Sequence, residues 1–169
     1  MQGSYSPGGW VGRITLCRRV GTLLEKSTED CKVTMTRLYT ADRIQKWGIS
    51  CSDNCVVCST DKETIDHLFF KCPVSAAVWH KVLLGIGVDK GSSGFTNELE
   101  VVTKRSRKTG DISKLYVMCF IEAVYQLWLN RNAIVFEQSG KTIESLAKEI
   151  LFRVSCRCTD SLKEKIAYV

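Results

Sequence analysis

The segment CVVCSTDKETIDHLFFKCP, residues 55–73, holds three cysteines and one histidine in the pattern C-x2-C-x8-H-x4-C. Thiolate sulfur and imidazole nitrogen are the ligands that zinc prefers in tetrahedral geometry. Cys55 and Cys58 can present two sulfurs from one tight turn, and His67 and Cys72 supply the other two ligands. Four such ligands fill the tetrahedron, so the spacing predicts one structural Zn²⁺ with no open position for catalysis.

Pro73 makes this ligand set geometrically feasible. The apolar spacing predicts a short helix over 63–71, and residues five apart on an ideal helix differ in direction by about 140°. His67 and Cys72 can therefore share one ion only if the helix breaks before Cys72. Proline disfavours helical geometry in the residue before it and suits the first turn of a helix. The sequence predicts a break near Cys72 and a new helix over 74–84.

Outward from this segment the chain is expected to be mostly α-helical. A glycine-rich segment, 1–32, is irregular, and a small zinc-stabilised helical domain follows over 33–88. It opens with a helix in 34–47, with Leu38, Ile44 and Trp47 on one buried stripe. Residues 89–112, with Gly91-Ser-Ser-Gly94 and a basic run, are expected to be a linker. The remainder, 113–169, should form an antiparallel pair of long helices.

The two long helices are predicted from apolar residues at helical spacing, over 112–136 and 142–168. The turn Ser139-Gly140-Lys141 between them is short enough for antiparallel packing. The expected buried residues are Tyr116, Phe120, Val124, Leu127 and Arg131 in the first helix and Ile143, Leu146, Ile150, Val154 and Leu162 in the second. Strand signals are weak, and only 14–16 and 55–58 look extended.

Composition narrows the class of protein. The chain has 169 residues, 44% of them hydrophobic and 25% charged, which is typical of a globular protein. The nine cysteines are odd in number and no signal-peptide pattern precedes them, so we expect a reducing compartment, nucleus or cytoplasm. No membrane span is expected, because the most apolar stretch, 115–129, is short and interrupted by Glu122 and Gln126.

The net charge of +6 permits contact with nucleic acid without establishing it. The candidate phosphate contacts are Lys104, Arg105, Arg107 and Lys108, with Arg13, Arg18 and Arg19 as possible additions. A flexible charged loop explains the same basic run equally well, and a nuclear localisation signal is another interpretation. Phe69, Phe70 and Trp79 could stack on bases, although core packing is the more economical explanation.

Several longer patterns resemble a known family. These are 39–48 (YTADRIQKWG), the four predicted zinc ligands, 63–73 (ETIDHLFFKCP) and Val78-Trp79. Together they resemble the zinc-binding domain at the C-terminal end of reverse transcriptases of plant non-LTR retrotransposons. Residues 128–136 (WLNRNAIVF) are similar to the helix that commonly follows that domain. The resemblance implies a module that helps a polymerase hold its template, but the chain has no aromatic-x-Asp-Asp pair of a polymerase.

Catalysis is not expected, because the predicted zinc site is closed and Glu98 and Glu100 are more simply a solvated patch. Cys51 and His80 are spare ligand candidates, and Cys156 and Cys158 are better explained as core or surface thiols. Two alternatives to nucleic-acid binding stay open. One is a protein-interaction or self-association module through the C-terminal helices, with Phe120, Leu127 and Trp128 at the interface. The other is a retrotransposon remnant without selected activity.

Overall fold

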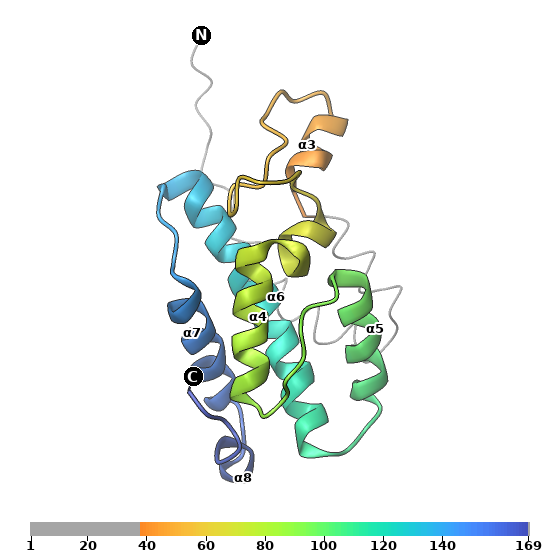
Figure 1. The fold of residues 1–169 in the computed structure, drawn as a ribbon, viewed down its shortest axis with the longest axis vertical. Coiled ribbons are helices and arrows are strands. Elements are labelled where there is room, and N and C mark those ends of the chain that lie inside the picture. The colour runs from red at the N-terminus through yellow and green to blue at the C-terminus, as the bar shows by residue number, and fades with distance from the viewer. Residues whose placement is uncertain (1–37, 169) are drawn as a thin grey trace.

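The computed structural model describes residues 38–168, and the segment 1–32 with Arg13, Arg18 and Arg19 lies outside them. The described part is helical (Figure 1), with a single isolated bridge between Asn54 and Lys62 as its β pairing. Its elements in chain order are α3 (Ala41–Lys46), the π-helical turn η2 (His67–Lys71), α4 (Pro73–Gly85), α5 (Phe95–Ser106), α6 (Asp111–Glu137), α7 (Ile143–Ser155) and α8 (Asp160–Lys163).

The helices are arranged around α6 and α4. Helix α4 packs against α6 and most extensively against α7, while α5 packs against α6 on the other side. The chain reverses between α6 and α7, so these two helices run antiparallel, as predicted (Figure 1). Helix α3 and the loop after it lie at one end of the molecule, and the last turn of α5 lies at the other (Figure 1).

One aromatic cluster joins the zinc segment to the long helices. The ring of Phe70 lies 5.3 Å from that of Trp79 and 5.4 Å from that of Phe120 in α6. Trp79 also meets Tyr116 edge-on at 5.4 Å, and all four side chains are fully buried. Phe69 is buried as well, so none of these rings is available for base stacking. The predicted zinc domain and helical pair therefore share a single core.

The expectation of a linker over 89–112 is wrong for residues 95–106, which form α5. Phe95, Leu99 and Val102 follow the i, i+4, i+7 spacing of one helix face and are buried. The sequence predicted a linker because this amphipathic pattern is short and is flanked by glycines and basic residues, which are typical of loops. Gly94 precedes the helix with a φ of +89°, a conformation that favours glycine.

Two helix predictions are confirmed within a residue at each end, those for α4 and α6. The predicted helix over 142–168 is too long, because α7 ends at Ser155 and the chain then folds back along α4. The backbone N–H of Ala167 donates to the Gly85 carbonyl at 2.8 Å, and Ile166 is buried. This return path, which depends on tertiary contacts, replaces a longer helix.

The predicted helix over 34–47 is too long, because residues 38–40 are not helical and α3 begins at Ala41, and the predicted buried stripe is incomplete. Leu38 is buried and Ile44 is half-buried, but Trp47 is 59% exposed and packs only edge-on against Tyr39 among the described rings. Gly48 terminates the helix as predicted, with a φ of +77°.

Helix α6 is longer than the apolar stretch that the sequence suggested. Its 27 residues are long and apolar enough to cross a membrane, by length and composition alone. In the protein, 56% of its most apolar window is buried, which is also what a core helix of a soluble protein shows. Glu122 and Gln126 lie in its buried face, where the Gln126 amide donates to the Glu122 carboxylate at 2.8 Å.

Candidate zinc site

Four side chains converge between the loop after α3 and the start of α4. The ligand atoms of Cys55, Cys58, His67 and Cys72 all lie within 4.8 Å of one another. A tetrahedral zinc with Zn–S bonds of about 2.3 Å has S–S edges of about 3.8 Å, so one ion fits between them. Cys55 and Cys72 are fully buried, His67 is nearly so, and Cys58 is half-buried. Within residues 38–168 this is the only such group of ligands.

The first two cysteines lie on a tight turn, as their spacing predicted, and the weak strand signal over 55–58 is not realised. The Cys55 carbonyl accepts from the Ser59 N–H at 2.7 Å, and the Cys55 N–H donates to the Asp61 carbonyl at 2.7 Å. Ser59 closes the turn with a φ of +58°. These bonds direct the two sulfurs to one side, as C-x2-C zinc turns require.

His67 and Cys72 are brought together by a π-helical turn. The N–H of Cys72 donates to the His67 carbonyl at 2.6 Å, an i→i+5 bond that places the two residues one wide turn apart. An α-helical turn would point them about 140° apart. Cys72 then leaves helical geometry, with a ψ of 129°, as expected for a residue before proline. The predicted break of the helix before Pro73 is confirmed. The π-turn in addition brings the His67 and Cys72 side chains to the same side.

Outer groups orient the ligands. His67 Nε2 lies 3.2 Å from Cys58 Sγ, which leaves Nδ1 facing the Asp61 carboxylate at 3.6 Å. A carboxylate beside the second ring nitrogen is the usual arrangement for a zinc-bound histidine. The Thr60 hydroxyl donates to Cys58 Sγ at 3.1 Å, which helps to hold this sulfur beside His67. His67 Nε2 is therefore the nitrogen positioned to bind the ion.

Cys72 is prepared for ionisation by its position at the start of α4. A hydrogen bond from Cys55 and the backbone N–H groups of Ser75 and Val74 lower the pKa of Cys72 to about 5, although burial opposes this. The N-terminus of a helix commonly stabilises a thiolate in this way. A metal that binds thiolates therefore meets one that is already ionised near neutral pH.

Glu63 connects the zinc loop to the long helices. Its buried carboxylate accepts from Arg131 Nη2 of α6 at 2.8 Å and from the Ala41 N–H at the start of α3 at 3.0 Å. Its own backbone N–H donates to the Asp53 carbonyl at 2.7 Å. The helical spacing predicted that Arg131 is buried but not which residue it pairs with. An arginine within the apolar face of a helix requires a buried hydrogen-bond acceptor. This requirement is the feature of the sequence that could have predicted a buried carboxylate partner for Arg131.

The other candidate residues lie apart from this cluster. Cys51 and Cys156 are exposed thiols, Cys158 is half-buried, and His80 lies on the outside of α4 at 3.2 Å from Asp89. The expectation that Glu98 belongs to a solvated patch is wrong. Its carboxylate is fully buried, because hydrogen bonds from Lys90, Ser93 and Tyr116 replace water.

The basic run does not lie beside the zinc site. Helix α5 begins near η2, where the Thr96 N–H approaches the Asp66 carboxylate at 3.5 Å. Its 12 residues span about 18 Å. Lys104 and Arg105 occupy its last turn and Arg107 and Lys108 follow, so the run lies at the opposite end of the molecule (Figure 1).

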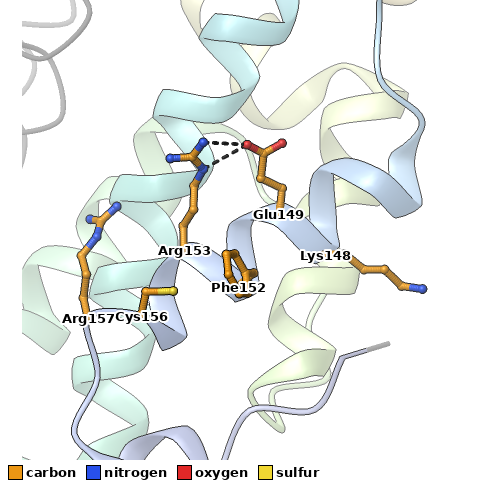
Figure 2. A pocket seen from close by; sticks show the side chains of 6 residues that line it. All are labelled: Lys148, Glu149, Phe152, Arg153, Cys156 and Arg157. Carbon is orange, nitrogen blue, oxygen red and sulfur yellow. Dashed lines mark hydrogen bonds and ion pairs between the residues drawn. The ribbon is translucent and has the colours of Figure 1, made fainter.

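A shallow hollow lies on the outer face of α7 and the turn after it. Figure 2 shows Phe152 at its centre and Arg153 directed to the Glu149 carboxylate, with hydrogen-bond and ion-pair distances of 3.0 and 2.9 Å. The remaining lining residues are Lys148, Cys156 and Arg157. All six come from one stretch of chain, so the hollow is a side of one helix rather than a cleft between elements.

Comparison with known proteins agrees with the site. Residues 30–79 match a family model described as "zinc-binding in reverse transcriptase". No curated protein and no solved structure matches the chain. The match concerns the zinc-binding domain alone, and the part of the chain that the structure describes contains no polymerase domain. Residues 30–79 are thus similar to the zinc-binding domain of reverse transcriptases, and Cys55, Cys58, His67 and Cys72 form a compact group that could bind one zinc ion.

Proposed function

We propose that this protein is a non-catalytic, zinc-stabilised module that binds the phosphate backbone of RNA or DNA through the basic end of α5. The proposal rests on three cationic side chains that are exposed and have no acidic partner among the described residues. Lys104, Arg107 and Lys108 are exposed, and none of them forms an ion pair with an acidic residue within 38–168. Most of the other lysine and arginine side chains within 38–168 pair with a carboxylate.

The spacing of these cations suits a nucleic-acid strand. Lys104 lies in the last turn of α5, and Arg107 and Lys108 follow directly where the helix ends, so the three cations are grouped within five residues of chain. Each can therefore meet a different phosphate of one strand. Such contacts release counterions and do not depend on base sequence. In this proposal zinc supports the fold and does not touch the ligand, since the two sites lie at opposite ends.

The resemblance of 39–48 and 63–73 to plant non-LTR retrotransposon sequences supports an origin of the domain in such an element. In that setting a phosphate-binding surface would help to hold a template. The same basic run fits a nuclear localisation signal, which supports a nuclear location.

Salt-dependent binding tests the proposal. A labelled single-stranded RNA should bind the zinc-loaded protein, and the affinity should fall steeply between about 50 and 200 mM salt. Replacing Lys104, Arg105, Arg107 and Lys108 by alanine should lower the log–log salt slope by roughly 3 and abolish binding at the higher salt.

A second quadruple variant provides the control, because it removes the same charge elsewhere. Lys46, Lys62, Lys148 and Lys163 are exposed lysines on other elements. Their replacement by alanine should leave most of the binding intact. Equal losses in the two variants would show that net charge alone matters, and the assignment of the surface would then be wrong.

A protein-interaction function remains the second candidate, on a surface different from the predicted one. Phe120 and Leu127 are buried in the protein's own core and cannot form an interface. Phe152, by contrast, is 60% exposed at the centre of the α7 hollow (Figure 2). If α7 mediates self-association, sedimentation should show a concentration-dependent dimer that Phe152→Ser dissociates.

A further inference from the structure

Arg105 differs from the other three cations of the basic run in how its side chain is held. Its guanidinium carbon lies 4.5 Å from the centre of the Tyr116 ring, a cation–π contact. Lys104, Arg107 and Lys108 have no ion pair or ring contact within the described residues. Three of the cations are therefore free to move, and one is positioned.

The ring beneath Arg105 is itself fixed. Tyr116 is fully buried, and its hydroxyl donates to Glu98 Oε2 at 2.6 Å. The other oxygen of Glu98 accepts from Lys90 Nζ at 2.7 Å and from the Ser93 hydroxyl at 2.9 Å. Burial would raise the pKa of Glu98, but these hydrogen bonds outweigh it and lower the pKa. The carboxylate is thus charged at neutral pH and holds the tyrosine in place.

This arrangement leaves the binding groups of Arg105 available. The Arg105 guanidinium lies over the ring and forms no hydrogen bond or ion pair with another residue within 38–168, so its N–H donors are unoccupied. Two of these donors match two oxygens of a phosphate group in a bidentate contact. Because the side chain is already ordered, less conformational entropy is lost on binding than for a free lysine.

We propose that Arg105 is the anchor of the basic surface, binding one backbone phosphate of RNA or DNA through two N–H donors. Lys104, Arg107 and Lys108 contribute attraction by charge alone. The inference rests on the proposed function and adds to it which residue makes the geometrically specific contact. It also predicts little preference between RNA and DNA, since both present the same phosphate.

Charge-conserving substitutions separate anchoring from charge. Arg105→Lys and Arg107→Lys make the same chemical change two residues apart, one on the ring-supported side chain and one on a free side chain. Each variant, checked for folding by circular dichroism, is titrated with a labelled single-stranded RNA and with a DNA of the same sequence. The titrations are repeated from about 50 to 200 mM salt.

Arg105→Lys should weaken binding about tenfold, as expected for the loss of one charge-assisted hydrogen bond. Its log–log salt slope should be unchanged, because the charge remains. Arg107→Lys, which changes a binding side chain without ring support, should weaken binding by only about twofold, clearly less than Arg105→Lys. The fold-changes in affinity should be the same for the RNA and for the DNA oligonucleotide.

Other outcomes overturn the inference. Equal effects of the two lysine variants would mean that Arg105 is no anchor, while the proposed function would survive. A strong preference for RNA would also contradict an anchor that contacts only phosphate. If the unmodified protein shows no salt-dependent binding, both the inference and the proposed function fail.

Discussion

At the scale of single residues, Cys72 has two structural roles. Its sulfur belongs to the zinc cluster, while its backbone N–H closes the π-turn to His67 and its carbonyl accepts from the Ala76 N–H of α4 at 2.8 Å. The thiolate that zinc needs is favoured by the first N–H groups of the same helix. Loss of this one sulfur therefore removes a ligand at the point where two helical segments meet.

The first prediction concerns this sulfur. Cys72→Ser should reduce zinc content from about one ion per chain to nearly none, because the apparent binding energy of such sites, of order 10 kcal/mol, requires all four ligands. Metal analysis of the purified protein measures the ratio. Cys51→Ser is the matched control, since Cys51 is an exposed thiol outside the cluster, and it should retain zinc. Zinc retention by Cys72→Ser would exclude Cys72 as a ligand.

At the scale of elements, Gly85 at the end of α4 lies in close contact with α7 and with the C-terminal segment. A Cβ placed there would lie 2.6 Å from Leu151 Cδ1 and 2.8 Å from the Ala167 carbonyl oxygen. The glycine thus allows α7 and the returning C-terminal segment to pack on the last turn of α4. The close contact leaves room for the segment after α8 to return to the end of α4, where the Ala167 N–H donates to the Gly85 carbonyl.

The second prediction follows from this close approach. Gly85→Ala should lower the free energy of unfolding by about 1–3 kcal/mol, because the added methyl overpacks a contact that includes backbone. Urea denaturation of the zinc-loaded protein measures the loss. Gly91→Ala is the control, since a Cβ at Gly91 meets nothing within 4 Å, and it should be neutral or slightly stabilising. An unchanged midpoint for Gly85→Ala would show that the contact is loose in solution.

At the scale of the whole molecule, the zinc segment and the long helices form one unit. The buried pair of Glu63 and Arg131 and the cluster of Phe70, Trp79 and Phe120 both cross between them. Removing one partner of a buried ion pair typically costs 3–5 kcal/mol, so a disordered zinc loop would leave Arg131 in an unfavourable state. Metal binding and the stability of α6 are therefore coupled.

The third prediction tests this coupling. Removing zinc with a chelator should reduce hydrogen-exchange protection in α6 and α7 as well as in η2, because all three belong to one cooperative core. Exchange followed by mass spectrometry, with and without chelator, measures it. Protection that falls only in residues 38–72 would instead indicate two independently folding units.

The sequence alone predicted the Cys/His cluster, the break before Pro73 and the bounds of α4 and α6, because residue spacing and proline geometry are local properties of the chain. The tertiary structure decided the remaining features. The π-turn depends on where Cys72 must lie in the folded protein. Helix α5 has an apolar face that is too short to stand out among glycines and lysines in the sequence. The burial of Glu63 and Glu98 depends on partners that are distant in sequence. Charged groups can be buried only where folding supplies such partners, and these contacts merged the predicted zinc domain and helical pair into one core.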